Sequence, residues 1–232
     1  MNRKAALGIY ALHEAERLTG VKARSLRRWL FGYSYASRLG RDGKNFSAPL
    51  WRSQYSSETF SEPVVGFHDL LEARVVGEFV KAGVPLIVIR SCLQSARDLF
   101  GIDYPFTAHR FLTDGRTIYR DALKSAEDGA LLNLKSRQFA FGSVIRPSLY
   151  AGIEYSGTAA RRWFPDARVK SIALDPTIAF GKPHVVDVGV PTAAVYSTYL
   201  AEDKDAVRTA KILEIDRRQV ESAVRFEERL AA

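Results

Sequence analysis

The stretch from residue 10 to residue 33, YALHEAERLTGVKARSLRRWLFGY, constrains the fold more than any other part of this 232-residue chain. In its first half, apolar side chains recur at every third position, at Leu12, Ala15 and Leu18, which places them on one face of a helix. Thr19-Gly20-Val21 then interrupts the pattern, because glycine accepts the left-handed backbone that ends a helix. The sequence therefore predicts two short helices joined by a tight turn.

The second of these predicted helices carries a concentration of positive charge. Its apolar residues, Leu26, Trp29 and Leu30, recur with helical spacing and are expected to face inward. The outward positions are polar or basic: Lys22, Arg24, Ser25, Arg27 and Arg28. A short helix with several cations and a hydroxyl on its outer face fits the major groove of DNA. A helical hairpin whose arginines are simply hydrated is the alternative.

Positive charge is concentrated in the first quarter of the chain. Residues 1–62 contain 11 Lys or Arg against 5 Asp or Glu, residues 63–120 contain 7 against 6, and residues 121–232 contain 16 against 15. Six of the eight excess positive charges therefore belong to the segment that holds the basic helix. A localised basic patch attracts a polyanion by counterion release, whereas diffuse charge mainly affects solubility. This distribution favours a nucleic-acid partner.

Size and composition exclude several other classes of protein. A chain of this length buries one large core or two modest ones. No apolar run approaches the roughly 18 to 20 residues that a membrane span needs, and the N-terminus lacks the long apolar region of a secretory signal. The single cysteine, Cys92, excludes an internal disulfide and is expected to be a small core residue. We therefore expect a cytoplasmic protein.

A second basic cluster follows the helix pair within residues 34–62. Glycines alternate there with cations, and aromatic residues flank them; the set comprises Tyr33, Tyr35, Arg38, Gly40, Arg41, Gly43, Lys44, Phe46 and Trp51. This composition predicts a wing, a hairpin or long loop whose cations straddle the phosphate backbone beside the groove. A surface loop without a DNA role is the alternative.

Hydrophobic spacing predicts the remaining elements. Helices are expected at 67–82, 85–100, 192–201, 203–213 and 216–230, with Thr192 as a cap of its helix. The Asp-Gly pair at 114–115 predicts a hairpin over 110–119, and a polar stretch at 124–129 is interpreted as a linker. Strands are expected at 131–134, 143–146, 153–155 and 169–174. The fold class is thus mainly α with small β elements (α+β): an N-terminal winged helix-turn-helix and a C-terminal three-helix, helix-turn-helix-like module.

The residues that usually build catalytic or metal sites are dispersed. His13, His68, His109 and His184 form no metal-binding spacing, and one cysteine adds no local cluster. Asp175 precedes a proline and is interpreted as part of a turn. No phosphate-cradling glycine motif occurs. We therefore expect no enzyme, no catalytic residue, no metal and no cofactor.

Two separate stretches resemble known families. Residues 10–29 resemble the opening of MerR-type winged helix-turn-helix regulators, with an aromatic start, Leu-Thr-Gly-Val and a Leu-Arg-Arg-aromatic helix. In the C-terminal half, a set of short motifs resembles the small domain of VapB-type antitoxins: Asp175-Pro176, Phe180-Gly181, Pro183, Gly189-Val190-Pro191-Thr192 and residues 220–226. The combination resembles a large subgroup of these antitoxins.

This resemblance implies two domains with different functions. Residues 1–122 would be a MerR-like DNA-binding domain, and residues 123–232 a β-containing connector with an antitoxin-like dimerisation domain. The implied protein is a homodimeric autorepressor of its operon and the antidote to a PIN-domain ribonuclease toxin. The implied contacts to operator DNA are Lys22, Arg24, Ser25, Arg27, Arg28 and Tyr33, with Arg38, Arg41 and Lys44 in the wing.

A MerR-like regulator that senses a small effector, without a toxin partner, is the alternative function. Aromatic residues of the middle region would then line an effector pocket: Phe139, Phe141, Tyr150, Tyr155, Trp163 and Phe164. Aromatics at such spacings also serve as ordinary core residues. An enclosed core favours the antitoxin, whereas an open aromatic pocket favours the sensor.

Overall fold

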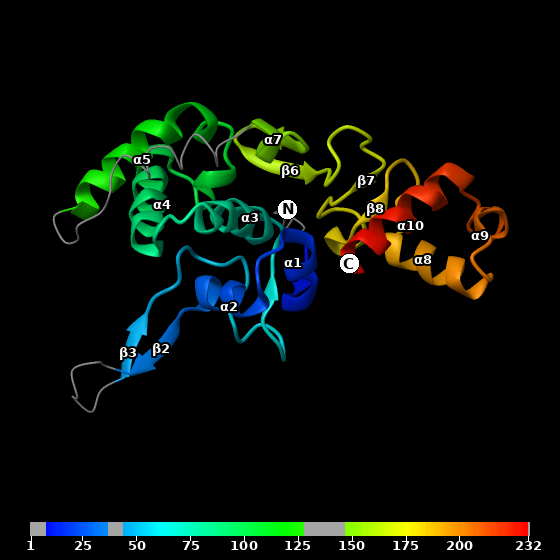
Figure 1. Cartoon of the computed structure of the whole chain (residues 1–232), viewed down its shortest axis with the longest axis horizontal. Helices are drawn as coiled ribbons and strands as arrows, with labels where there is room; N and C mark the ends of the chain where they lie inside the picture. The colour runs from blue at the N-terminus through cyan, green and yellow to red at the C-terminus, as the bar shows by residue number, and fades with distance from the viewer. Residues whose placement is uncertain (1–7, 37–43, 128–146, 232) are drawn as a thin grey trace, which may run out of the picture. The chain divides into compact units, whose positions relative to one another are not determined.

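The computed structural model describes residues 8–36, 44–127 and 147–231 (Figure 1). Helices dominate it, and small antiparallel two-stranded sheets accompany them, so the predicted mainly α, α+β class is confirmed. The chain forms two compact units, one of residues 11–149 and one of residues 1–10 with 150–232. Within the described ranges, none of the helices is long and apolar enough to cross a membrane.

The predicted helix pair opens the first unit. It consists of α1 (Leu12–Thr19) and α2 (Ala23–Phe31). Gly20 ends α1 with φ +70°, and its N–H donates to the carbonyl of Glu16 at 2.7 Å. The predicted inward residues Leu26, Trp29 and Leu30 are all buried. The turn and the inward face of the second helix are therefore confirmed.

The helix pair packs against α3 (Phe67–Lys81), the central helix of this unit. Val21, at the turn between α1 and α2, is buried and lies against Gly77 of α3. A Cβ added at Gly77 would approach the Val21 Cγ2 to 2.5 Å, so a larger residue here would force Val21 to shift. Two short strands also occur near here, β1 (Tyr10–Ala11), where the two units divide, and β4 (Val64–Val65).

Three further elements complete the core of the first unit. They are α4 (Leu86–Phe100), the 3₁₀-helix η1 (Pro105–Thr107) and α5 (Phe111–Glu127). Four aromatic rings from α3, η1 and α5 meet in one cluster, with centroid distances of 4.5 to 5.7 Å: Phe79, Phe106, Phe111 and Tyr119. The two predicted helices at 67–82 and 85–100 correspond to α3 and α4, and Gly101 follows α4 with φ +68°.

The predicted hairpin at 110–119 is wrong, because this segment belongs to α5. Phe111, Ile118, Tyr119 and Ala122 recur with helical spacing and are buried, and this burial outweighs the turn preference of Asp-Gly. Gly115 here leaves room for an aromatic ring, since an added Cβ would lie 3.0 Å from the Phe111 ring. The same helix passes through residue 122, where a domain boundary is predicted, and reaches Glu127, so the linker predicted at 124–127 is wrong; residues 128–129 lie outside the described ranges.

The second unit begins with small β elements. After the short helix α7 (Pro147–Tyr150), β5 (Ile153–Ser156) pairs antiparallel with β6 (Ala159–Trp163), and β7 (Ile172–Ala173) with β8 (His184–Val185). The predicted strand at 153–155 is confirmed as β5. The strand predicted at 169–174 is reduced to β7, and those at 131–134 and 143–146 lie outside the described residues.

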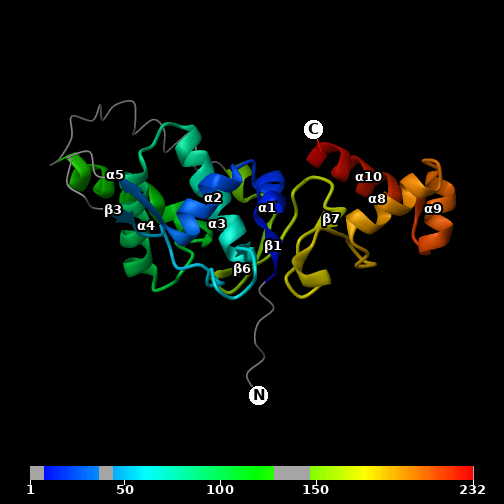
Figure 2. The same ribbon diagram turned by 90° about the horizontal axis from the view of Figure 1, so that it is seen from below.

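Three helices close the second unit: α8 (Thr192–Ala201), α9 (Ala206–Leu213) and α10 (Arg217–Ala231). They lie together in both views, with α10 packed on α8 and α9 (Figures 1 and 2). Asp205 caps α9 by accepting from the N–H groups of Val207 and Arg208. The predicted cap of α8 is wrong: Thr192 is its first residue, and its hydroxyl donates to Glu227 of α10 at 2.5 Å.

Candidate nucleic-acid interface

The outer face of α2 presents three arginines to solvent. Arg24, Arg27 and Arg28 are exposed, and none of them forms an ion pair with a carboxylate in the described part of the chain. Positions three and four residues apart lie on one side of a helix, so their guanidinium groups share one surface. These three cations are therefore accessible to a ligand and are not neutralised by carboxylates of the described residues.

The N-terminus of α2 is held by Glu16 of α1. One carboxylate oxygen of Glu16 accepts the Ala23 N–H at 2.8 Å, and the other pairs with the Lys22 ammonium at 3.0 Å. These two donors hold the pKa of the Glu16 carboxyl below its usual value, the Ala23 N–H having the larger effect. Among the predicted helix contacts that the structure describes, Lys22 is therefore paired with a carboxylate, although its side chain is 83% exposed.

The C-terminal end of the basic face continues onto the next strand. The Arg28 guanidinium lies 4.7 Å from the centroid of the Tyr33 ring, which in turn lies 5.9 Å from the Tyr35 ring. A cation over an aromatic face is attracted by the ring quadrupole. Ser25, the remaining predicted contact of the helix, is half-buried in the first turn of α2. The helix and the strand after it thus form one surface.

The predicted wing contains a hairpin. β2 (Tyr33–Ala36) pairs antiparallel with β3 (Lys44–Ser47), in a register that opposes Tyr33 to Ser47 and Ala36 to Lys44. Arg38 and Arg41 lie outside the described residues, and Lys44 is described only as part of the β3 backbone. The structure therefore describes the base of the hairpin, directly after α2.

A close approach of Phe46 fixes the hairpin against the end of α2. Gly32 follows α2 with φ +72°, and a Cβ there would lie 2.6 Å from the tip of the Phe46 ring. Phe46 is 63% exposed, so its ring covers the glycine while keeping much of its surface in solvent. A side chain at position 32 would displace the hairpin.

Hydrogen bonds that the sequence did not predict hold the segment after β3 against α2 and α3. The Leu50 N–H donates to the Trp29 carbonyl at 2.7 Å, and the Trp51 indole N–H donates to Asp69 of α3 at 2.9 Å. Asp69 also accepts from Ser53, Gln54 and Gly66, and its burial raises the pKa of its carboxyl. In the sequence, the signal for these contacts is Asp69 in the first turn of a predicted helix, with Trp51 earlier in the chain as a candidate donor.

The residues considered for catalysis are buried, stacked on a neighbouring ring or hydrogen-bonded within a turn. His68 stacks on the Tyr104 ring at 5.2 Å, and burial lowers the pKa of its imidazole. Cys92 is buried, as expected, and burial raises the pKa of its thiol. Asp175 accepts from the N–H and hydroxyl of Thr177 in a tight turn. The described residues contain no cluster of three or more His, Cys, Asp or Glu that could hold a metal ion.

The aromatic residues considered for an effector pocket are packed as core where the structure describes them. Tyr150, Trp163 and Phe164 are each 4% exposed, and Tyr155 is half-buried. Phe139 and Phe141 lie outside the described residues. The buried set has the surroundings of an ordinary core.

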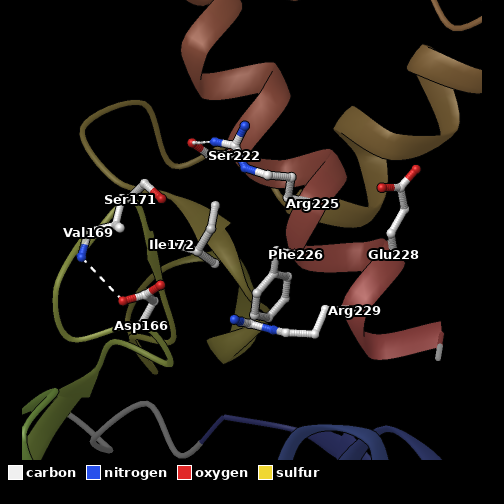
Figure 3. A pocket seen from close by; sticks show the side chains of 9 residues that line it. All are labelled: Asp166, Val169, Ser171, Ile172, Ser222, Arg225, Phe226, Glu228 and Arg229. Atoms are coloured by element: carbon white, nitrogen blue, oxygen red, sulfur yellow. Dashed lines mark hydrogen bonds between the residues drawn. The ribbon is translucent and has the colours of Figure 1, made fainter.

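A surface groove of about 410 Å³ lies in the second unit, between the 166–172 segment and α10 (Figure 3). Its basic residues, Arg225 and Arg229, are matched by Asp166 and Glu228. Arg225 donates to the Ser222 hydroxyl, and the Arg229 guanidinium lies 5.5 Å from the Phe226 ring. This balance of charge gives the groove no electrostatic preference for a polyanion, in contrast to α2.

Comparison with known proteins supports the fold. No protein-family model matches the chain, and no curated protein matches it either. The chain is similar to the crystal structure of Rv2018 from Mycobacterium tuberculosis, with a TM-score of 0.67 and 20% sequence identity. The similarity covers 93% of this chain and 96% of that one. The fold of this chain therefore also occurs in a solved structure.

Proposed function

We propose that this protein binds double-stranded DNA, with α2 in the major groove and the β2–β3 hairpin beside it. The observation that carries the proposal is the exposed set Arg24, Arg27 and Arg28, without ion pairs to described carboxylates, on one face of a short helix. The concentration of net positive charge in residues 1–62 supports the same partner.

The surroundings of the three arginines divide them into two roles in this proposal. Arg24 and Arg27 extend freely from α2 and would reach base edges, where arginine recognises guanine through two hydrogen bonds. Arg28 is held over Tyr33 toward the hairpin and would bind phosphate. In a homodimer, two copies of α2 would read half-sites one or more helical turns apart.

We further propose that the protein is an antitoxin that represses its own operon and neutralises a PIN-domain ribonuclease toxin. This part of the proposal rests on the resemblance to VapB-type antitoxins over residues 175–192 and 220–226. Two of the resembling residues form buried contacts within the second unit. The Asp175 carboxylate accepts the Thr177 N–H in a turn, and the Thr192 hydroxyl donates to Glu227 of α10. The burial of Tyr150, Trp163 and Phe164 supports an antitoxin over an effector-sensing regulator.

Arginine substitutions on α2 test the DNA-binding proposal. Arg24→Ala and Arg27→Ala should each weaken operator binding by about 1 to 3 kcal/mol if they read bases. The melting temperature should stay the same, because both side chains are exposed. Fluorescence anisotropy with operator DNA measures the effect, with Arg116→Ala, an exposed arginine of α5, as the control. Unchanged affinity of both α2 variants at low salt would exclude α2 as the reading helix.

The antitoxin proposal has a separate test. A gene for a PIN-domain protein should lie beside this one, and the two products should copurify after co-expression. Adding this protein should then suppress RNA cleavage by the purified partner. Cleavage that continues at a molar excess of this protein would reject the antitoxin role without affecting the DNA-binding proposal.

A further inference from the structure

A second basic surface occurs in the first unit, away from the outer face of α2. It is a groove of about 770 Å³ between the segment after β3 and helix α4. Three arginines line it, Arg52, Arg90 and Arg97, together with hydroxyl and amide groups of α4. No aspartate or glutamate is among the lining residues. The groove therefore concentrates positive charge without an internal counter-charge.

Arg97, which is one of the lining residues, has hydrogen-bond donors without a partner in the described structure. Its Nε and one terminal nitrogen, Nη2, are buried and have no hydrogen-bond partner in the described structure. Buried guanidinium N–H groups are almost always paired, because leaving them unpaired forfeits their hydration. The nearest carboxylate along the helix, Asp98, accepts instead from the Gln94 amide at 2.9 Å.

Arg90 is held rigidly but keeps its charge. Its two terminal nitrogens donate to the carbonyls of Pro49 and Ala48 at 2.6 and 2.7 Å. Carbonyl groups fix the position of the guanidinium without neutralising it. Arg52 lies on the opposite wall and is exposed. The groove is thus lined by one cation held by two carbonyls, one cation with unpaired donors and one exposed cation.

The spacing along α4 directs its polar groups toward one ligand. Gln94 and Arg97 lie four and seven positions after Arg90, and Ser91 lies three positions before Gln94, so these residues share one side of the helix. Guanidinium, hydroxyl and amide donors around a cleft without carboxylates are the groups that recognise phosphate.

We propose that this groove is a phosphate-binding site. The inference rests on the proposed function in naming its first source, the duplex phosphates that flank the bases read by α2. The groove belongs to the same compact unit as α2, and its wall at Leu50 is hydrogen-bonded to the Trp29 carbonyl at the end of α2. The second source with the same chemistry is a free phosphorylated small molecule.

Pyrophosphate and inorganic phosphate test the site directly. Isothermal titration calorimetry on the full chain, at constant ionic strength, should detect binding of one of these anions and not of chloride. Arg97→Gln and Arg52→Gln should each weaken that binding at least tenfold. Arg116→Gln, which removes a charge of the same unit outside the groove, should change it less than twofold. A loss of the same size in the Arg116 variant would show general charge attraction and overturn the proposal.

Operator duplexes of two lengths identify the source of the phosphate. If the duplex supplies it, Arg97→Gln should weaken binding to a long duplex about fivefold, lower its salt slope by about one unit and leave a duplex limited to the core site unaffected. If a free ligand supplies it, the substitution should impair pyrophosphate binding alone. Either result supports the site, whereas unchanged binding of both pyrophosphate and the long duplex would overturn it.

The outcome is separable from that of the proposed function. Loss of pyrophosphate binding in the Arg97 variant, with DNA binding insensitive to Arg24 and Arg27, would retain the phosphate site and reject α2 as the DNA reader. DNA binding that needs Arg27, combined with a groove that binds neither pyrophosphate nor flanking DNA, would do the opposite. Melting temperatures within about 2 °C of the parent protein show that the variants fold.

Discussion

At the scale of single residues, the contacts that matter most are those that hold a charge in place. Arg28 lies over the Tyr33 ring, Glu16 caps the basic helix, and Asp69 gathers four donors beneath the base of the hairpin. Each contact positions a backbone segment or a cation next to the proposed DNA surface. Their effects are therefore expected in DNA affinity or in pH dependence.

Tyr33 provides a test of how Arg28 is positioned. Tyr33→Leu should remove the aromatic face and weaken operator binding about twofold to fivefold, since an exposed cation–π contact contributes about 0.5 to 1 kcal/mol. Tyr33→Phe keeps the ring and should bind as the parent protein does, if the ring alone is used. Anisotropy titrations measure both. Equal loss in the two variants would assign the effect to the phenol hydroxyl instead.

Glu72 predicts a pH dependence of stability. Its carboxylate is buried in α3 and accepts from the N–H groups of Phe106 and Thr107 and from the Thr107 hydroxyl. Burial raises the pKa of Glu72 to about 8 in the folded protein. Below pH 4.5 both states hold the proton. Between pH 4.5 and 8 the folded state binds more protons than the unfolded state, so stability should fall as the pH rises.

The Glu72→Gln variant isolates this contribution. Its amide does not titrate, so its melting temperature should decline less between pH 5 and 8 than that of the parent protein. The remaining slope belongs to other groups, among them Asp69, whose carboxyl pKa is also raised by burial. Thermal melts at several pH values provide the comparison. If the melting temperatures of the two proteins changed with pH in parallel, Glu72 would not be a source of the pH dependence.

At the scale of elements, close packing at a glycine decides how the helix pair sits on α3. Helix propensity favours alanine over glycine by about 1 kcal/mol in a helix interior. Glycine is nevertheless favoured at position 77, because Val21 occupies the space where a Cβ would lie. Tertiary packing here outweighs local preference, as it does for Asp114-Gly115 within α5.

Gly77→Ala should therefore destabilise the protein, by about 1 to 3 kcal/mol, the typical cost of overpacking. Val21→Ala should relieve the conflict, so the double variant should be less destabilised than the sum of the two single changes, with a coupling of at least about 0.5 kcal/mol. Chemical denaturation of the parent protein, the two single variants and the double variant measures this coupling energy. A stabilised Gly77→Ala protein would show that Val21 moves aside without cost.

At the scale of the whole molecule, the proposed function predicts a dimer. A dimer presents two α2 helices to a pair of half-sites, which a single copy cannot do. The second unit exposes apolar side chains on its C-terminal helices: Leu200 of α8 and Val207 and Ile212 of α9, each between 46 and 59% exposed. Burial of such residues between copies would stabilise a dimer by roughly 25 cal/mol per Å² of apolar surface.

We expect a homodimer of about twice 25.9 kDa in solution. Val207→Glu combined with Ile212→Glu should shift it toward the monomer and weaken operator binding, because each charge would have to be buried at the contact. Light scattering coupled to size-exclusion chromatography measures the mass. Leu99→Glu, which changes an equally exposed residue of the first unit, should leave it unchanged. A dimer that persists in the double variant would place the contact elsewhere.

Local patterns were sufficient for most helices and for the basic face. The period of Leu26, Trp29 and Leu30 predicted which side of α2 is buried, and Gly20 predicted the turn, because both depend on residues a few positions apart. The helix at 192–201 was predicted with its observed limits for the same reason. The outward arginines followed from the inward apolar positions.

Long-range contacts decided what local patterns could not. The division into units depends on Ile9 and Tyr10, which donate hydrogen bonds to the carbonyls of Phe180 and Gly181. The position of the hairpin depends on Trp51, Asp69 and Arg90. The groove of Arg52, Arg90 and Arg97 likewise joins two segments about 40 positions apart. Periodicity reports only how one element presents its own faces, whereas burial and hydrogen bonding between distant elements depend on how the whole chain packs.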